Sequence, residues 1–460
     1  MNPVAARRSE EKARKKHLNI HGIIGASVLI VAQVLMFYRV EPFFSWFYCF
    51  AWWSYILMVD SLIYRLKGNS LILSRPREFL LMIPWSFTIW FFFEMVNLVM
   101  RNWYYINVPN SSLIRFMGYA VAYGTVLPGI FETTELIETL GLFRRVSVPK
   151  ITVTRGWYLV FIFTGVLFLV LPLIVSRYTF PLIWGALIFL LEPINHRFGG
   201  KSLLAEWEKG SLRKFTLLLV AGLICGGLWE FWNFWARTKW VYTVPFFDEF
   251  KLFEMPVLGF LGFPPFAVEC YAIYSFISLF RHKRGWEEDT ARLHRQRRTS
   301  LSLRIVTGLS IFVFYVLSAR AIDRYTVGST VPLLDDFPSL TQNEKDDLEQ
   351  LEIHTVDDLL YEVRGPGRYE RIQKILDSPP GRLEELLKKA RLIELKGLGI
   401  KYFLLLQKAG IDSVEMLAQE EPEGIQAKLV GVAGENPETR YPTKAQIKIW
   451  IMEARRRSEK

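Results

Sequence analysis

Cysteine and histidine are scarce in this chain of 460 residues, which contains three cysteines and six histidines. Cys49, Cys225 and Cys270 lie separately in apolar runs, so the sequence has neither a disulfide framework nor a Cys-x-x-Cys motif. The histidines show no ligand spacing, and the sequence contains no glycine-rich phosphate loop and no nucleophile triad. These absences exclude a disulfide-stabilised secreted scaffold and argue against a bound metal or cofactor, so none is expected.

Acidic residues are under-represented in the first 330 residues, which carry 36 Lys and Arg against 21 Asp and Glu. Residues 331–460 carry 20 against 24, and the whole chain is 51% hydrophobic and 15% aromatic. A basic surplus in an apolar region is typical of loops that face anionic headgroups and the cytoplasm, and is poor evidence for nucleic-acid binding. Composition therefore predicts a polytopic membrane protein with a soluble tail.

Nine apolar runs are expected to form transmembrane helices, because a backbone in lipid must satisfy its own hydrogen bonds. Their approximate cores are 21–39, 43–63, 79–100, 113–138, 157–176, 180–196, 215–236, 255–280 and 305–321. No cleavable signal peptide is expected, since residues 1–19 are charged and the first run is long enough to span. The ninth run is the weakest: if it spans, the tail lies outside the cytoplasm, and if it lies in the interface, the tail lies inside.

The distribution of Lys and Arg predicts the orientation. The loops on the side of the N-terminus hold 27 of these residues, and the loops on the other side hold 7. The positive-inside rule therefore places the N-terminus in the cytoplasm. We expect a multi-pass protein of the inner (plasma) membrane, with the C-terminal domain outside the cytoplasm.

An internal duplication is the strongest pattern in the sequence. "EMVNLVMRNWYYINVP" (94–109) and "EFWNFWARTKWVYTVP" (230–245) share Glu-x-x-Asn-x-x-x-Arg, followed by Trp-x-Tyr and Pro. Further matches join Asp60, Arg65 and Ser70 to Glu192, Arg197 and Ser202, Phe79 to Phe215, and Pro128 and Glu132 to Pro265 and Glu269. Each repeat holds four spans, an even number, so the two repeats should be parallel, about an axis along the membrane normal.

The predicted fold is all-α, a membrane bundle of two parallel four-helix repeats with a small soluble domain. The expected segments are a basic N-terminus (1–19), repeat 1 (20–140), a linker (141–156), repeat 2 (157–281), a basic linker (282–304), a ninth helix (305–322) and a soluble helix-hairpin-helix-like domain (331–460).

Carboxylates at membrane depth are the candidate functional residues. Glu94, Asn97 and Arg101 fall at i, i+3 and i+7, on one helix face. An ionisable residue at that depth costs about 2.5 kcal/mol or more, so repeated acids should face a bundle interior. The candidate catalytic or proton-binding residues are Glu94, Glu132, Glu230 and Glu269, with Asn97, Arg101, Asn233, Arg237, Asp60 and Glu192 as supporting residues. The alternative is that these clusters only join helices by hydrogen bonds.

Neighbouring features have simpler interpretations. Glu135 and Glu138 have no counterpart in the second repeat, which carries Ala272 and Ser275 there, so we interpret them as a solvated cytoplasmic helix end. Prolines within the apolar runs are expected to kink or break helices, and they are Pro128, Pro264 and Pro265.

The tail has its own motifs. Thr355-Val-Asp-Asp358 and Asp412-Ser-Val-Glu415 are similar to capping boxes that begin helices. Gly397-Leu-Gly399 lies between two helical patterns and is typical of a helix-hairpin-helix turn. With the final "YPTKAQIKIWIMEARRR", this arrangement resembles the tandem helix-hairpin-helix domains of unknown function at the C-termini of bacterial proteins. In DNA-binding members of that superfamily the turn binds a phosphate, which would involve Gly397, Gly399 and Lys401.

DNA is nevertheless an unexpected partner, because the tail is acidic and its first hairpin region, "SLTQNEKDD", has no glycine turn. We expect the tail to bind a protein partner or to oligomerise. The membrane part resembles the membrane carotenoid cyclase and hydratase group, which implies acid–base chemistry on an isoprenoid-like molecule. Three functions remain open: an enzyme acting on a hydrophobic molecule dissolved in membrane lipid, a transporter or channel coupled to protons or cations, and a membrane scaffold that recruits partners through its tail.

Overall fold

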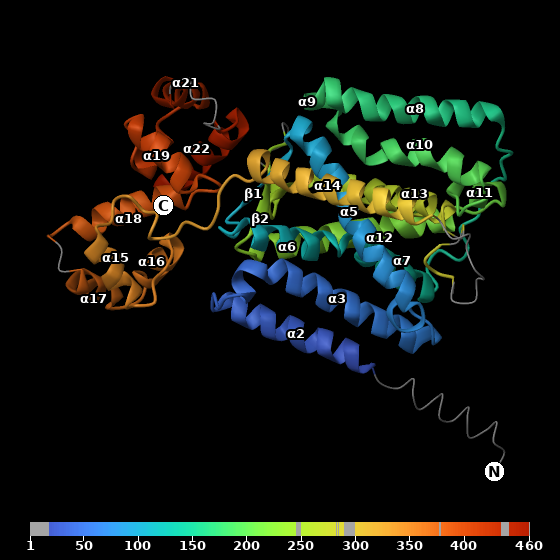
Figure 1. Cartoon of the computed structure of the whole chain (residues 1–460), viewed down its shortest axis with the longest axis horizontal. Coiled ribbons are helices and arrows are strands. Elements are labelled where there is room, and N and C mark those ends of the chain that lie inside the picture. The colour runs from blue at the N-terminus through green and yellow to red at the C-terminus, as the bar shows by residue number, and fades with distance from the viewer. Residues whose placement is uncertain are drawn as a thin grey trace, which may run out of the picture. The chain divides into compact units, whose positions relative to one another are not determined.

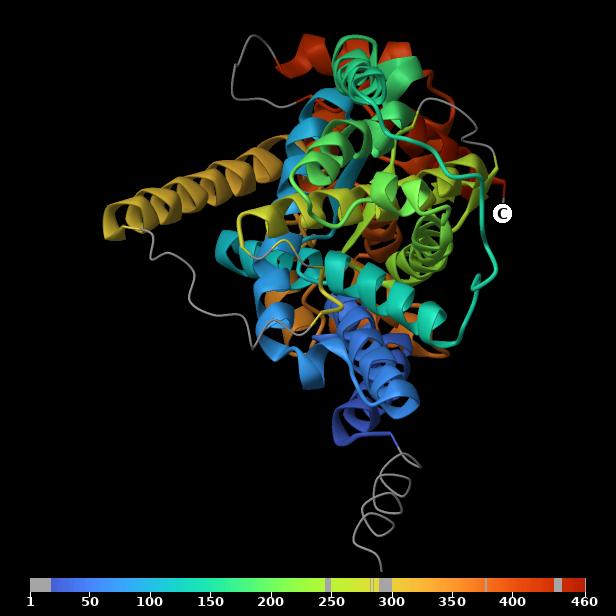
Figure 2. The same ribbon diagram turned by 90° about the vertical axis from the view of Figure 1, so that its right-hand side faces the viewer.

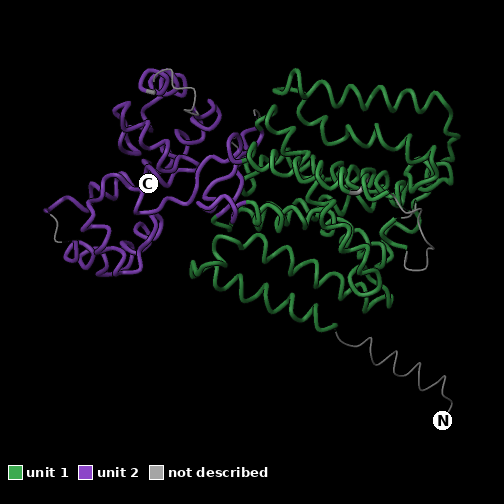
Figure 3. The backbone as a smooth tube through the Cα atoms, viewed as in Figure 1, with its two compact units in different colours: residues 1–101, 116–237, 246–322 green, residues 102–115, 238–245, 323–460 purple. Residues whose placement is uncertain are grey.

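The computed structural model of the chain describes residues 18–244, 250–281, 283, 285–288, 300–376, 379–433 and 441–459, and these are mostly helical (Figure 1). The first 17 residues and most of the basic linker, which contributed to the predicted orientation, lie outside the described residues. The chain divides into two compact units (Figure 3). Unit 1 comprises residues 1–101, 116–237 and 246–322, and unit 2 comprises residues 102–115, 238–245 and 323–460.

Nine apolar helical segments among the described residues are long enough to cross a membrane. Each overlaps one of the nine apolar runs in the sequence. Their bounds are Ile20–Phe37, Phe43–Lys67, Pro76–Met100, Ser112–Thr139, Arg155–Ile174, Ser176–Arg197, Arg213–Trp235, Val257–Leu279 and Ile305–Tyr325.

The two halves of the apolar part contain similar series of elements. The first half contains α2 (Ile20–Phe37), α3 (Phe43–Lys67), α4 (Leu71–Ser74), α5 (Pro76–Met100), β1 (Trp103–Ile106), α6 (Ser112–Tyr123) and α7 (Val126–Thr139). The second half contains α8 (Arg155–Ile174), α9 (Ser176–Thr179), η1 (Phe180–Leu182), α10 (Ile183–Arg197), α11 (Leu203–Glu208), α12 (Arg213–Trp235), β2 (Lys239–Tyr242), β3 (Lys251–Leu252), β4 (Met255–Pro256), η2 (Val257–Gly262) and α13 (Phe263–Leu279). α14 (Leu301–Tyr325) follows.

Three of the expected spans are interrupted near prolines, and one of them is the sixth, in which the 3-10 helix η1 contains Pro181 and precedes α10. The fourth consists of α6 and α7, which are separated at residues 124–125, and Pro128 is the third residue of α7. The eighth begins as the 3-10 helix η2 and continues as α13, with Pro264 and Pro265 in its first turn. Proline is tolerated in a first helical turn, because the backbone N–H groups there have no intrahelical acceptor. Pro128, Pro264 and Pro265 therefore lie in the first turns of helical segments, where the expected spans are broken.

Small residues allow the helices of unit 1 to approach closely. α2 packs on α3, where a Cβ on Gly22 would lie 2.4 Å from the Ser61 side chain. α8 packs on α10 in the same way, where a Cβ on Gly165 would lie 2.7 Å from Leu190. α12 packs on both α7 and α13 and therefore joins the two halves. Glycine at helix contacts is typical of bundles in lipid, where packing replaces the hydrophobic effect.

α14 is a peripheral helix of unit 1. Figure 2 shows it extending away from the other helices of that unit, and only 11% of its most apolar stretch is buried. It contacts α5 through Tyr315, whose hydroxyl lies 2.6 Å from that of Thr88 and whose ring stacks on Phe91. An apolar helix with most of its surface uncovered is suited to contact with lipid.

Unit 2 is built around a small sheet. β1 and β2 pair in antiparallel fashion, and on its other edge β1 is joined in parallel by residues 326–331, which follow α14. The Tyr105 N–H donates to the carbonyl of Thr326 (2.9 Å), and the Gly328 N–H donates to the carbonyl of Tyr105 (2.7 Å). Both edges of β1 are therefore occupied, and all four of its residues are buried.

The remainder of unit 2 is a helical domain with its own core. Its largest buried side chains include Phe337, Tyr402, Phe403 and Trp450. Its helices are α15 (Gln342–Glu349), α16 (Val356–Glu362), α17 (Arg368–Ile375), α18 (Arg382–Ile393), α19 (Gly399–Lys408), α20 (Val414–Ala418), α21 (Pro422–Ala433) and α22 (Lys444–Ser458).

One of the two predicted capping boxes is present in the tail. Thr355 and Asp358 form the complete box at the start of α16. The second prediction was wrong by one residue, because the N-cap of α20 is Ser413, whose side chain accepts a hydrogen bond from the Met416 N–H, and not Asp412. Ser and Asp have similar N-cap preferences, so the sequence alone could not distinguish these neighbours.

Candidate functional site

The four candidate glutamates are all fully buried, on four different helices. Glu94 and Glu230 lie near the C-terminal ends of α5 and α12, and Glu132 and Glu269 lie on α7 and α13. The Trp90 indole N–H donates to Glu94 (3.0 Å), and the backbone N–H of Leu187 on α10 donates to Glu269 (2.8 Å). Burial of all four agrees with the argument that repeated acids in lipid turn away from it.

The acids nevertheless lie at two levels of the bundle. The backbone N–H of Leu127 on α7 donates to the hydroxyl of Ser86 on α5 (3.0 Å), and near the other end of this antiparallel pair Arg75 contacts Glu135. Glu94 lies eight residues beyond Ser86, and Glu132 lies five residues beyond Leu127 in the opposite direction. At 1.5 Å per residue, Glu94 and Glu132 are separated by about 20 Å along the bundle. The structure does not bring the four carboxylates to one point.

Asp60 and Glu192, predicted as supporting residues, anchor two short helices. Asp60 accepts hydrogen bonds from the Ser70 hydroxyl (2.9 Å) and the Ile72 N–H (2.7 Å) at the start of α4, and its Oδ2 lies 3.0 Å from His21 Nε2. Glu192 accepts from the Ser202 hydroxyl (2.8 Å) and the Leu203 N–H (2.7 Å) at the start of α11. Each carboxylate thus provides acceptors for N–H groups that a helix start leaves unpaired.

The predicted Asn and Arg residues follow Glu94 and Glu230 in the chain, three and seven positions later. Asn97 and Asn233 are buried, at 2% and 1% exposure. Arg101 ends α5 in a left-handed conformation (φ 54°) and is exposed. Arg237 is buried, contacts Glu41 (3.2 Å) and lies over the ring of Phe44. The two arginines, which match in sequence, therefore have different environments.

Glu132 lies in a polar cluster at the level of the bundle where Arg75 contacts Glu135. Neither of its carboxylate oxygens accepts a hydrogen bond from a donor among the described residues, and Asp60, Glu135 and Arg75 are close enough to interact with it electrostatically. Glu135 Oε1 accepts from Arg75 Nη2 (2.5 Å) and from Lys67 Nζ (2.6 Å). The arrangement is a carboxyl without donors beside a buried ion pair, and carboxyls of this kind can exchange protons.

The interpretation of Glu135 and Glu138 as a solvated helix end was wrong. Glu135 is 1% exposed, and Glu138 is ion-paired with Arg213 (3.1 Å) and Lys214 (2.6 Å). The physical reason is tertiary contact, since Arg75 lies 60 residues before Glu135 in the chain. The basic residues of the neighbouring loops were the available signal, but in the sequence they indicate only membrane orientation.

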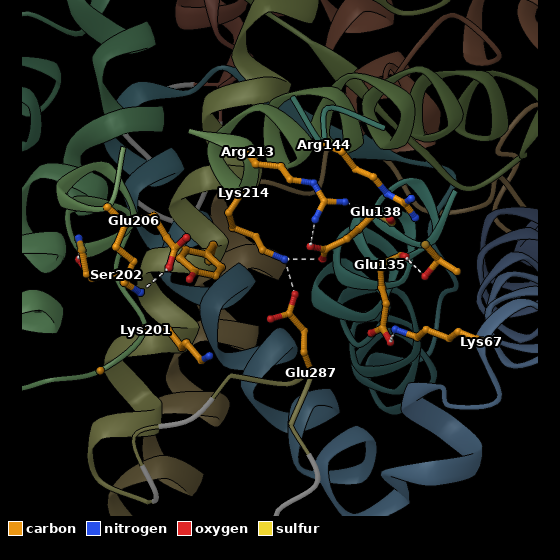
Figure 4. A pocket seen from close by; sticks show the side chains of 15 residues that line it. Lys67, Glu135, Glu138, Arg144, Lys201, Ser202, Glu206, Arg213, Lys214 and Glu287 are labelled. Carbon is orange, nitrogen blue, oxygen red and sulfur yellow. Dashed lines mark hydrogen bonds and ion pairs between the residues drawn. The ribbon is translucent and has the colours of Figure 1, made fainter. Parts of the chain in front are cut away.

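A charged cleft of about 640 Å³ opens beside this cluster, entirely within unit 1 (Figure 4). It is lined by Lys67, Glu135, Glu138, Thr139, Arg144, Gly200, Lys201, Ser202, Ala205, Glu206, Lys209, Arg213, Lys214, Tyr271 and Glu287. In Figure 4, the Lys214 ammonium lies between Glu138 and Glu287 and pairs with both. The volume is within the range of sites for small molecules or headgroups. The sequence alone assigns no binding role to these residues.

Two further polar groups outside the apolar segments are ordered by their neighbours. The pKa of Glu208 is lowered by the hydrogen bond from the Val153 N–H and by His196, whose Nδ1 bonds the hydroxyl of Tyr158 (2.7 Å). Burial acts to lower the pKa of Arg281, but its hydrogen bonds to Glu78 more than offset this, so that the pKa is raised. Both groups therefore keep their charge over the ordinary pH range.

The predicted glycine turn of the tail is covered within unit 2. A Cβ on Gly397 would lie 2.4 Å from the ring of Tyr104, and one on Gly399 would lie 2.8 Å from Ser329. The Tyr104 hydroxyl donates to the carbonyl of Lys396 (3.0 Å). Lys401 is exposed, with its ammonium over the ring of Tyr402. A turn packed in this way has protein where a DNA phosphate would have to approach.

Comparison with known proteins identifies only the tail. Residues 338–457 match a domain family described as a domain of unknown function (DUF4332). No curated protein and no solved structure matches the chain. A C-terminal domain of unknown function was expected from the sequence, whereas the resemblance of the membrane part to carotenoid cyclases receives no support from these comparisons.

Proposed function

We propose that this chain is a multi-pass membrane protein that binds a hydrophobic or amphiphilic molecule and acts on it by acid–base chemistry, with Glu132 as the proton-exchanging group. One observation carries the proposal: the Glu132 carboxyl is fully buried and lacks a hydrogen-bond donor among the described residues. An ionised carboxylate without donors is costly in such a place, so the site favours the neutral acid, which can donate a proton. Asp60 and Glu135 provide neighbouring proton acceptors.

The proposed architecture is two parallel four-helix repeats. Ser70 bonds Asp60 as Ser202 bonds Glu192, at positions that match in sequence. Between β1 and β2, Trp103 pairs with Tyr242, Tyr105 with Trp240, and Tyr104 with Val241. Because Trp103 and Tyr105 match Trp240 and Tyr242, this register is that of two equivalent strands related by a local two-fold axis. Such an axis along the membrane normal is what parallel repeats require.

The small sheet of unit 2 supports the predicted topology. β1 follows α5, β2 follows α12, and residues 326–331 follow α14. The segments that follow these three helices therefore pair in one sheet. These are the third, seventh and ninth spans, which end on one side of a membrane if all nine cross it. When the protein spans the inner membrane with its N-terminus in the cytoplasm, these three helices end outside the cytoplasm. The tail, which follows the ninth span, then also lies outside the cytoplasm.

This topology predicts where an introduced cysteine reacts. Lys388→Cys in the tail should be labelled by a membrane-impermeant maleimide in intact spheroplasts, because both the residue and its compartment are accessible. Lys150→Cys, an exposed residue in the loop before α8, is the matched control and should be labelled only after lysis. Labelling of both in intact cells, or of neither, would contradict the topology. The tail contains no native cysteine, so the background comes from the apolar part alone.

The function can be tested before the substrate is identified. Purified protein is incubated with lipid extract in deuterated water, and the lipids are analysed by mass spectrometry. Delivery of a deuteron to a carbon–carbon double bond, followed by loss of a proton from a neighbouring carbon, should produce a lipid in which one deuterium has replaced one hydrogen. The wild type should produce it, and Glu132→Gln should produce about tenfold less or lower still, because general acid catalysis contributes roughly 10²–10⁴ in rate. Glu94→Gln, which changes a buried glutamate at the other level, is the matched control and should retain labelling.

Two outcomes would overturn this proposal. Equal labelling by wild type and Glu132→Gln would exclude Glu132 as the acid. Proton uptake by proteoliposomes under a pH gradient, lost in Glu132→Gln while no lipid is labelled, would instead assign the same carboxyl to a transporter.

A further inference from the structure

The charged cleft carries more positive than negative charge. Six of its lining residues are Lys or Arg and four are Glu. It is formed by the ends of α3 and α7, Arg144 in the loop after α7, residues between Gly200 and Lys214, Tyr271 on α13, and Glu287. These segments lie in or next to the loop regions richest in Lys and Arg. Since those loops are expected at the cytoplasmic face, the cleft lies at the level of lipid headgroups, where basic pockets recognise anionic lipids.

Most of these cations are already paired with carboxylates, and the exception indicates where an anion would bind. Five of the six cations each contact a glutamate, and they are Lys67, Lys201, Lys209, Arg213 and Lys214. Arg144 has no carboxylate partner among the described residues. Its guanidinium folds over Gly141, where a Cβ would lie 2.8 Å from Arg144 Nε and where the backbone is left-handed (φ 83°). Glycine at this turn therefore permits the placement of the one cation that, among the described lining residues, remains available to a ligand.

Arg144 could bind an anion, whereas Glu135, in the wall of the cleft, has one oxygen to which no described residue donates a hydrogen bond. Its Oε1 is bonded to Arg75 and Lys67, but its Oε2 is buried and has no hydrogen-bond donor among the described residues. A buried acceptor without a donor is unfavourable, and a hydroxyl or ammonium group of a ligand would supply the missing hydrogen bond. The cleft thus combines an available cation with an acceptor that lacks its donor.

We propose that the cleft binds the headgroup of an anionic phospholipid or lipid phosphate, with the phosphate on Arg144 and a headgroup hydroxyl or ammonium on Glu135 Oε2. This inference assigns a substrate class to the proposed function and rests on it. An arginine holds a phosphate through paired N–H groups, and the acyl or isoprenoid chain of such a lipid would extend into the hydrocarbon layer beside the bundle.

Binding is measured without turnover, on the full-length protein in a neutral detergent. The probes are dioctanoyl phosphatidylglycerol, dioctanoyl phosphatidylcholine and sodium phosphate, and bound lipid is counted by native mass spectrometry over a concentration series. We expect phosphatidylglycerol to bind the wild type and Arg144→Gln to weaken it by about tenfold or more, which is the loss of one charge-assisted contact. Arg145→Gln, an exposed neighbour outside the cleft, removes the same charge and should bind as the wild type does.

Each other outcome overturns the inference. Equal weakening by Arg144→Gln and Arg145→Gln would indicate nonspecific attraction to basic loops, and equal binding of phosphatidylcholine would exclude recognition of net anionic charge. Displacement of the lipid by sodium phosphate at equal concentration would assign the cleft to a free phosphate compound. The failure of this inference is distinguishable from that of the proposed function, because binding is measured without turnover and Glu132→Gln should bind phosphatidylglycerol as the wild type does. The proposed function fails instead on equal deuterium labelling by the wild type and Glu132→Gln, whichever lipid the cleft binds.

Discussion

Replacement of Arg75 by leucine should destabilise the protein by about 3–5 kcal/mol, which is typical when one partner of a buried ion pair is removed. Arg75 is 3% exposed, and its guanidinium donates to Glu135 (2.5 Å), to the carbonyl of Trp286 and to the carbonyl of Ser70 (3.3 Å). In Arg75→Leu only Lys67 would remain, among the described residues, to compensate Glu135. The thermal unfolding midpoint in detergent should fall by about 5 °C or more.

Two variants decide whether the buried acid causes the loss. Arg77→Leu changes an exposed arginine two residues away and should shift the midpoint little. The double variant Arg75→Leu with Glu135→Leu removes both charges and should recover most of the stability, since a buried pair can be replaced by apolar residues at small cost. A double variant as unstable as the single one would show that the packing of Arg75, and not its charge, is what matters.

The positions of the helices followed from the sequence because their causes are local. Long apolar runs must be helical in lipid, and each of the nine runs overlaps one apolar helical segment of sufficient length among the described residues. The same holds for Asp60 with Ser70 and Glu192 with Ser202, whose constant spacing places a carboxylate beside the start of a short helix. Spacing of about ten residues is information that a single sequence carries.

The charged cleft could not be predicted, because it depends on contacts between distant segments. Arg75 with Glu135, Lys214 with Glu138, and Lys214 with Glu287 join residues that lie 60, 76 and 73 positions apart. In the sequence, these cations are indistinguishable from those that only set orientation. The level of each acid was likewise unpredictable, since helical periodicity gives the face of a residue and not its depth relative to another helix.

The burial of β1 has a signal in its sequence. Its sequence Trp-Tyr-Tyr-Ile has no polar alternation, and all four residues are buried. A strand with both faces covered is expected to lack alternation. Tyr104, between the two matched aromatic residues, was therefore a candidate for contact with another part of the chain, and the structure shows that this part is the glycine turn of the tail.

That contact leads to the second large effect, in Gly397→Ala. Gly397 has φ 78°, and a Cβ there would lie 2.4 Å from Tyr104 and 3.0 Å from Ile106, so the variant must both strain the backbone and displace β1. The left-handed backbone costs about 1–2 kcal/mol and overpacking typically about 1–3 kcal/mol more. We expect faster hydrogen–deuterium exchange in residues 103–106 as well as in the turn, because both sides of the contact should open.

Gly381→Ala is the matched control for this experiment. Gly381 has φ 86°, but a Cβ there would have no atom within 4 Å among those described, so this variant adds the backbone strain without the clash. It should therefore leave exchange in β1 unchanged. Tyr104→Ala should partly rescue Gly397→Ala by making room for the methyl group. Identical behaviour of the two alanine variants would mean that the glycine turn does not press on β1.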